Sequence, residues 1–165
     1  MTIRDWNSAD GQAFQGDIVI MAVPDDIVID MSDEIAPRDG RLIIQEGELS
    51  GHHHAIAVRN FRAGGVHVGD PSTATRDTKL RKALGGRTKP TEGTARFYRD
   101  PAAVQNMVQA GLLTRADLAI GILVVELGPV VIQHEEHDGI CEPIGRYYLG
   151  RQVESVGAEQ RVVVD

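Results

Sequence analysis

Five of the six histidines in this chain fall into two short groups, and these groups are the residues best suited to chemistry. The first group, residues 52–54 (HHH), leads into the strand-like segment 54–58. The second, residues 134–137 (HEEH), follows the strand-like segment 130–133 and adds two carboxylates. Neutral imidazole and carboxylate groups are ligands for divalent metals such as zinc, iron and manganese. The two groups predict one metal site, provided that the fold brings them together.

Spacing decides which of these side chains can share a site. Alternate residues of a strand point to the same face, so His52 and His54 would lie on one face and His53 on the other. The second group has two histidines three positions apart after a strand-like run, which is not the HExxH spacing of helical zinc peptidases. The residues predicted as metal ligands are His52, His54, His134 and His137. Glu136 is predicted as a fifth ligand or as the catalytic general base.

Two other interpretations of the histidines remain open. They can form a structural polar network, since imidazole both donates and accepts hydrogen bonds, or they can be unrelated surface positions. Other catalytic signatures are absent from the sequence, which has no GxSxG, P-loop or GxGxxG motif and indicates no organic cofactor. The single cysteine, Cys141, is interpreted as a small core residue.

Short apolar segments separated by glycine and proline predict a mainly β fold, a single-domain barrel or sandwich of about eight short strands over residues 1–165. The predicted strands are 15–23, 41–45, 54–58, 65–68, 120–127, 130–133, 147–153 and 161–164. Gly128-Pro129 marks a hairpin or a tight corner. A helical insertion is predicted after Asp100-Pro101, an N-cap with proline at the first helical position, and Gly111 ends it. Thr114 begins a second short helical piece.

The segment 71–92 differs in charge from the rest of the chain. It holds six basic residues against Asp77 and Glu92, a balance of +4, so the remaining chain carries −11 to give the net charge of −7. With the helical piece it makes an insertion at about 71–118. A solvated basic loop is one interpretation, and a docking arm for an acidic partner, another subunit or nucleic acid is the other.

Composition excludes several classes of protein. A net charge of −7 and 4% aromatic residues argue against a nucleic-acid partner. The apolar runs are far shorter than the ~20 residues of a membrane helix, so no membrane partner is expected. The first eleven residues, MTIRDWNSADG, lack the apolar stretch of a signal peptide, and a lone cysteine fits a reducing compartment. We expect a cytoplasmic protein, or a virion protein if the chain is phage-encoded.

Several sequence elements resemble those of a family of small, mostly uncharacterised β-rich proteins from bacteria and tailed phages. In order, the matching elements are QGD at 15–17 with its strand, GE-x-x-GH-x-H at 47–54, HxEH at 134–137, PxGxY at 143–147, RQ at 151–152 and the terminal strand at 161–165. The middle segment of about 71–118 is longer than in typical members, which implies an added docking element. Val153-Glu154 stands where the family usually has an aromatic residue. The resemblance implies no particular reaction, but it points to the same histidines and to Glu136.

The sequence leads us to expect a small soluble β protein with a phage- or prophage-related structural, assembly or binding role. It would act as a homo-oligomer or with a virion partner through the basic segment 71–92, and its His/Glu cluster would bind a divalent metal. The alternative is a metal-dependent enzyme, of the hydrolase or oxygenase type, that uses the same cluster.

Overall fold

The computed structural model describes residues 3–5, 11–39, 41–46, 51–57, 60–62, 65–68, 93–127, 129–156 and 159–163. Within these residues the chain forms fourteen strands and one helix of nine residues, α2 (Pro101–Gln109), which lies between two strands in the sequence. The predicted mainly β fold with a short helical insertion is therefore confirmed, although the strands are more numerous than expected. The basic segment 71–92 lies outside the described residues.

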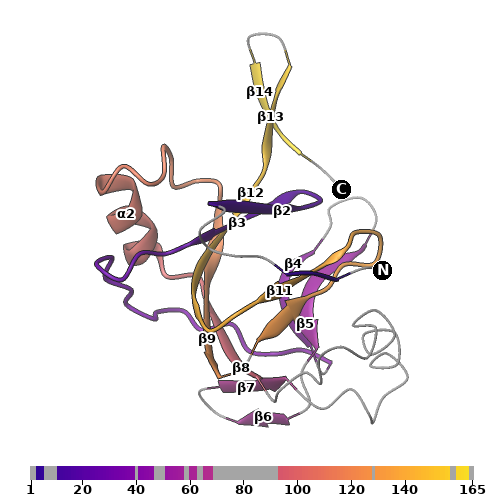
Figure 1. Cartoon of the computed structure of the whole chain (residues 1–165). Coiled ribbons are helices and arrows are strands. Elements are labelled where there is room, and N and C mark those ends of the chain that lie inside the picture. Colours follow the sequence, from indigo (N-terminus) through magenta and orange to yellow (C-terminus); the bar gives the residue numbers. More distant parts are fainter. Residues whose placement is uncertain are drawn as a thin grey trace.

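Seven strands form one antiparallel sheet in the order β2-β3-β12-β9-β8-β7-β6. Their bounds are Gln12–Gln15 (β2), Ile18–Ala22 (β3), Gly145–Arg151 (β12), Ala119–Leu127 (β9), Gly93–Tyr98 (β8), Gly65–Val68 (β7) and Asn60–Arg62 (β6). The sheet is twisted along its length, with β2 and β3 at one end of the molecule and β7 and β6 at the other (Figure 1).

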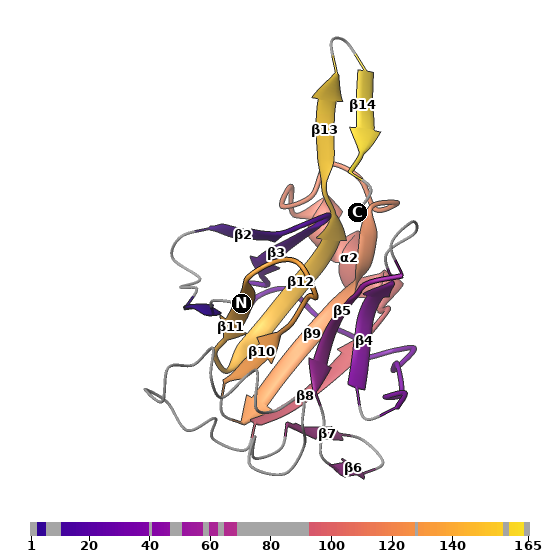
Figure 2. The same ribbon diagram turned by 90° about the vertical axis from the view of Figure 1, so that its right-hand side faces the viewer.

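Three smaller sheets accompany the large one. Their strands are β1 (Ile3–Asp5), β11 (Gly139–Glu142) and β10 (Val130–Ile132) in the first, β4 (Arg41–Glu46) and β5 (His53–Ala57) in the second, and β13 (Val153–Val156) and β14 (Glu159–Val162) in the third. Ala55 and Gln133 exchange backbone hydrogen bonds of 2.9 and 2.8 Å, which join β5 to the end of β10. The strands of the first two small sheets lie over the large sheet (Figure 2), which gives a sandwich-like arrangement, and none of the described sheets closes into a barrel.

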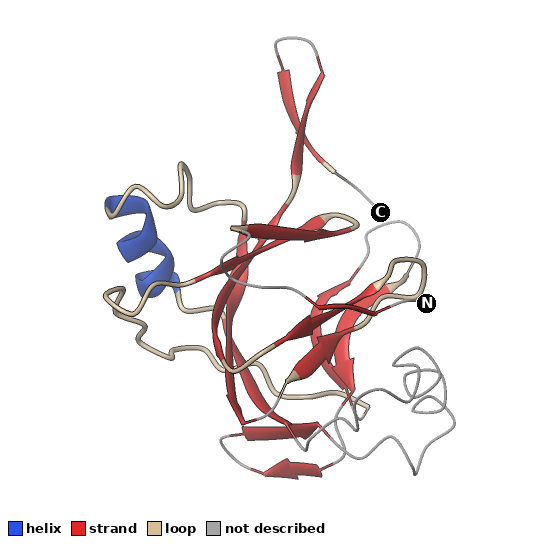
Figure 3. Ribbon diagram, viewed as in Figure 1, coloured by secondary structure: helices blue, strands red, loops and turns tan. Residues whose placement is uncertain are grey.

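The central strands β9 and β12 are buried on both faces. On one face, Leu123 and Tyr147 pack into a core shared with β4, β5, β10 and β11. On the other, Ile122 and Tyr148 pack against α2, which covers the opposite side of the sheet (Figure 3). Burial on both faces explains why β9 reads as a nearly continuous apolar run rather than as an alternating one.

Asp100 caps α2 as predicted and also fixes a second segment. One carboxylate oxygen accepts from the backbone N–H of Ala103 at 3.0 Å, and the other accepts from the N–H groups of Asp30 and Met31, both at 2.8 Å. Asp100 is fully buried, so these three bonds satisfy a carboxylate that burial would otherwise destabilise. The helix and the loop beneath it are therefore positioned by one side chain.

One local prediction needs correction, and the structure decides between two alternatives at another point. Residues 114–118 form bends and a turn, with the N–H of Ala119 bonded to the carbonyl of Ala116 at 3.1 Å, and not a second helix. The point between β9 and β10, where the sequence allowed a hairpin or a corner, is a corner, because the two strands belong to different sheets. Leaving the large sheet here allows β10 to cross into the second layer, where it meets β5.

Glu142, at the end of β11, is fully buried, and its carboxylate oxygens have no hydrogen-bond partner among the described residues. Burial in this environment raises the pKa of Glu142 to about 8, since the charged form loses its hydration. The nearby Tyr147 hydroxyl donates instead to the carbonyl of Pro143 at 2.8 Å. At neutral pH Glu142 is therefore a neutral acid within the core.

This burial makes the stability of the chain depend on pH. Between about pH 4.5 and about pH 8 the unfolded chain loses the Glu142 proton while the folded chain keeps it, so stability falls as pH rises through this window. We expect Glu142→Gln to be on the order of 1–3 kcal/mol more stable than the parent at about pH 9, and about equal to it below pH ~4.5. Urea unfolding at several pH values measures the difference.

Glu34→Gln is the control, because Glu34 is exposed. It should follow the parent at every pH. A Glu142→Gln variant whose advantage does not change with pH would contradict the assignment of a neutral, buried acid.

Candidate functional site

The fold brings members of the two histidine groups together, which the sequence left open. His52 directly precedes β5 and His54 is the second residue of that strand, while His134 and His137 lie in the segment between β10 and β11. The ring of His134 stacks on that of His54 with centroids 4.4 Å apart and on that of His137 with centroids 4.6 Å apart. His52 meets His134 edge-on at 5.7 Å. The contact follows from the pairing of β5 with the end of β10.

His53 lies apart from this ring cluster, as expected for its place between two strand residues that share a face. Its backbone N–H donates to a carboxylate oxygen of Glu135 at 2.8 Å, and its ring approaches Glu46 and Glu135 at 4.0 Å. Glu135 also lies 3.8 Å from the Arg41 guanidinium. A partly exposed charged rim is therefore formed by His53, Glu46, Glu135 and Arg41.

His54 is the buried centre of the site, with 1% of its surface exposed. Its Nδ1 lies 2.9 Å from Oε1 of Gln15, and its Nε2 lies 2.7 Å from Oδ1 of Asp17. Gly16 and Asp17 form the two-residue loop between β2 and β3, and Gly16 has a φ of 55°, which glycine adopts without strain. This tight loop directs Asp17 toward the ring of His54.

The hydrogen bonds also indicate which nitrogens of the His54 ring carry protons. The amide nitrogen of Gln15 donates to the carbonyls of Ile132 at 3.1 Å and Asp138 at 2.6 Å, so its oxygen must face His54. Asp17 likewise offers an acceptor. Both ring nitrogens of His54 therefore face acceptors when Asp17 is ionised, and we infer that the ring is an imidazolium paired with the Asp17 carboxylate.

His134 has the complementary state. Its Nδ1 accepts from the backbone N–H groups of Glu136 at 3.2 Å and His137 at 3.3 Å. A nitrogen that accepts two hydrogen bonds carries no proton, so His134 is the neutral tautomer with its proton on Nε2. A neutral ring therefore stacks on the charged ring of His54, which avoids placing two cations 4.4 Å apart.

The outer part of the site is more open. His52 is 29% exposed and Glu136 58% exposed, and His52 Nδ1 lies 3.7 Å from the Glu136 carboxylate. Within the described residues, no group of three or more histidine, cysteine, aspartate or glutamate side chains is arranged to hold a metal ion. A metal at His54 would have to displace either Asp17 or Gln15. Metal binding by these histidines stays a prediction.

Sequence reasoning did not identify Gln15, Asp17 or Gln45 as part of the site. Gln45 on β4 is buried, and its amide nitrogen lies 3.4 Å from Oδ2 of Asp17. Gln15 and Asp17 fall within the predicted strand 15–23, which the structure divides into the end of β2, a loop at 16–17 and β3. A strand pattern carries no sign of which polar side chains are buried. The matching QGD element was the one available signal.

Comparison with models of protein families, with curated proteins and with solved structures gave no match. Among the described residues, no helix has the length and apolar character needed to cross a membrane. The function of the chain is therefore argued from its own residues.

The charged pair makes His54 essential for stability. His54→Ala leaves Asp17 buried without its partner, and we expect a loss of about 3–5 kcal/mol in the free energy of unfolding. Asp17→Asn keeps an acceptor for His54 and should cost less. His53→Ala, on the neighbouring rim, serves as the control and should cost at most about 1 kcal/mol.

Urea unfolding measures these losses, and ¹⁵N NMR of the histidine rings reads the protons directly. Two protonated nitrogens are expected for His54 in the folded parent at neutral pH, against one for His134. A His54 ring with a bare nitrogen would overturn the imidazolium assignment, even if the variants were unstable.

Proposed function

We propose that this chain is a non-catalytic assembly protein, of the phage-related kind that its motifs resemble, and that it pairs with a second copy of itself through the hairpin β13–β14. One observation carries the proposal. The strand β12 continues past Gln152 into β13, beyond the edge of the large sheet, and there it pairs only with β14 among the described strands. The hairpin stands away from the body of the molecule in both views (Figures 1 and 2).

A projecting pair of strands is poorly stabilised in a single chain. An isolated two-stranded hairpin is marginally stable in water, and each of its outer edges presents unpaired backbone groups that a further strand can bond. The base of this hairpin is held by the backbone bond from Val163 to the carbonyl of Gln152 at 2.8 Å. A partner strand or face would stabilise the remainder.

The side chains on this hairpin suit a second copy of the same chain. Glu154 lies directly opposite Arg161, and both are exposed. Val162 adds an apolar side chain that is 40% exposed. A two-fold contact places the same patch on both sides, so a patch with one acid, one base and one apolar residue is complementary to itself. These residues favour a homodimer over a partner of strongly one-sided charge.

The closed state of His54 supports a structural role for the buried half of the histidine cluster. Both of its ring nitrogens are engaged, whereas a catalytic base or a metal ligand needs a nitrogen with an available lone pair. The bonds to Gln15 and Asp17 instead hold separate strands together.

The second candidate is a metal-dependent enzyme of the hydrolase or oxygenase type. The convergence of three histidine rings favours it. The ring centroid of His134 lies 4.6 Å from that of His137 and 5.7 Å from that of His52, and Glu136 lies beside His52. These residues carry the donors that zinc, iron and manganese accept, and Glu136 is placed to act as the general base.

Charge reversal tests the assembly proposal. Glu154→Arg and Arg161→Glu should each convert the oligomer to monomer, because each sets like charges against one another, and the double reversal should restore it. Sedimentation velocity over a series of concentrations measures the result. Glu126→Arg is the matched control, since Glu126 also forms a cross-strand ion pair, with Arg96 at 3.7 Å, within the large sheet.

A chain that is monomeric at every concentration would refute self-assembly. An oligomer that survives removal of residues 153–163 would show that the hairpin is not the contact.

Elemental analysis tests the second candidate. If the metal-dependent function is correct, the untagged parent carries about one equivalent of zinc, iron or manganese, and the double variant His52→Ala with His134→Ala carries none. His53→Ala is the control and should retain the metal, because His53 lies outside the ring cluster. A folded parent without metal, after purification and after incubation with each ion, would exclude this candidate.

A further inference from the structure

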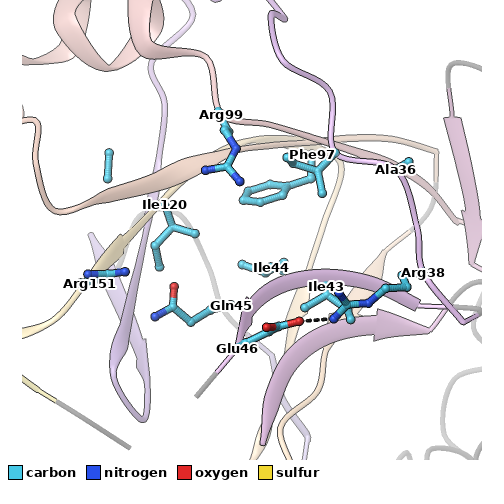
Figure 4. A pocket seen from close by; sticks show the side chains of 12 residues that line it. Ala36, Arg38, Ile43, Ile44, Gln45, Glu46, Phe97, Arg99, Ile120 and Arg151 are labelled. Carbon is cyan, nitrogen blue, oxygen red and sulfur yellow. Dashed lines mark hydrogen bonds and ion pairs between the residues drawn. The ribbon is translucent and has the colours of Figure 1, made fainter. Parts of the chain in front are cut away.

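A cleft of about 470 Å³ lies beside β4, and its walls also include the segment 35–38 and the ends of β8, β9 and β12. Its interior is apolar, since Ile44 and Phe97 belong to the buried core and Ile120 packs against that core. Figure 4 shows β4 along one side of the cleft, with Phe97 and Ile120 across from it. Among the described residues, the lining includes neither the histidine cluster nor the hairpin β13–β14. The cleft is therefore a separate surface of the body.

The strand β4 has one edge that faces away from β5, and part of this edge has no strand beside it. Arg41 and Arg38 exchange backbone hydrogen bonds of 3.0 and 2.8 Å on the side of β4 away from β5. Alternate residues of an antiparallel strand turn their N–H and carbonyl groups to the same side, so Ile43 turns its own groups to that side as well. No described residue pairs with Ile43 there. Ile43, which lines the cleft, therefore offers a backbone donor and a backbone acceptor to a further strand.

The hairpin carries a matching edge on β14. The N–H of Val163 donates to the carbonyl of Gln152 on the side of β13, so the preceding residue, Val162, turns its main-chain groups to the outer side. Among the described strands, β14 pairs with β13 alone. The side chain of Val162 is 40% exposed. One position on β14 thus combines unpaired backbone groups with an exposed apolar side chain.

The cleft and this edge both lie at the base of the hairpin. Arg151, the last residue of β12, lines the cleft, and β13 begins just after it at Val153, which is paired with Val162. The hairpin leaves the body at this point (Figures 1 and 2), and no described residue of β14 lines the cleft of its own chain. A two-fold rotation near the base can therefore set Val162 of each copy against Ile43 of the other.

We propose that the cleft receives the outer edge of β14 from a second copy of the chain. The two strands pair through the main-chain groups of Val162 and Ile43, and the side chain of Val162 packs on the apolar interior of the cleft. An added strand satisfies both the backbone edge and the apolar surface, whereas a small apolar ligand would leave the backbone groups of Ile43 unpaired.

This inference rests on the self-assembly proposed above, and it names the part of the body that the hairpin contacts. Strand pairing uses the edge of β14, whereas Glu154 and Arg161 act through their side chains. Both contacts can therefore form in one dimer.

A proline in the edge of β4 tests the strand pairing. Ile43→Pro removes the N–H that faces the cleft without removing a bond between β4 and β5, because proline is tolerated where a strand N–H points outward. We expect the dissociation constant of the dimer to rise about tenfold, as measured by sedimentation velocity. Ile43→Ala is the matched control, since it shortens the same side chain but keeps the N–H, and it should dimerise nearly as well as the parent.

Disulfide formation between copies tests the same contact without changing the backbone. One chain carries Ile43→Cys and the other Val162→Cys, both with Cys141→Ala to remove the native thiol. Residues directly opposite each other in paired strands have Cβ atoms about 4.5–5.5 Å apart, so oxidation of the mixture should link positions 43 and 162. Leu112→Cys replaces Ile43→Cys in the control mixture, because Leu112 is 39% exposed and outside the cleft, and it should give no link to position 162.

The outcomes separate this inference from the self-assembly on which it rests. A chain that is monomeric at every concentration would overturn both. Suppose instead that the oligomer requires residues 153–163 but tolerates Ile43→Pro as well as Ile43→Ala, and that positions 43 and 162 do not link. Docking in the cleft would then be wrong, while the contact through the hairpin would stand. Linkage of the Leu112→Cys control as efficiently as Ile43→Cys would also overturn the docking. If Ile43→Pro does not fold, the disulfide experiment alone decides.

Discussion

The imidazole of His54 lies where water does not reach it, and the arrangement of three sheets depends on how that desolvation is compensated. The ring belongs to β5, yet its partners Gln15 and Asp17 belong to the end of β2 and the loop after it. Gln15 in turn bonds carbonyl groups at the end of β10 and just before β11. One buried network thus joins the large sheet, the β4–β5 pair and the three-stranded sheet. A shift of any one layer would leave a buried polar group unsatisfied, which costs more than the bond itself contributes.

The same network explains why four clustered histidines do not repel one another. Asp17 stabilises a positive charge on His54, whereas the backbone N–H groups around His134 stabilise an unprotonated nitrogen. The two stacked rings are therefore held in different states by different partners. Protonating His134 at Nδ1 would break both backbone bonds and add a second cation to the stack.

The parts of the fold that the sequence predicted are those with local signals. Asp100-Pro101 announced the start of α2, and the apolar run at β9 announced a strand. A shared site for His54 and His134 was one of three interpretations that the sequence left open, and the sequence could not decide among them. The sequence did not predict the hydrogen-bond partners of these two rings. Whether Asp17 faces solvent or His54 depends on the packing of β5 over the β2–β3 loop, which is a contact between residues 37 positions apart and leaves no local pattern. Glu142 is a similar case, since a glutamate at the end of a short strand is normally exposed.

The strand that runs from β12 into β13 connects these features physically. Its first part lies in the middle of the large sheet, with Tyr147 and Leu149 in the core. After Arg151, at the end of β12, the N–H of Gln152 donates to the backbone carbonyl of Asp17 at 2.6 Å. The carbonyl of Gln152 accepts from Val163 and so anchors the hairpin. Asp17 is thereby bound through its side chain to His54 and through its main chain to the strand that carries the hairpin. The position of that strand at the point where it leaves the sheet is therefore set by the loop that contains Asp17, so the histidine network is connected to the projecting hairpin through the main chain.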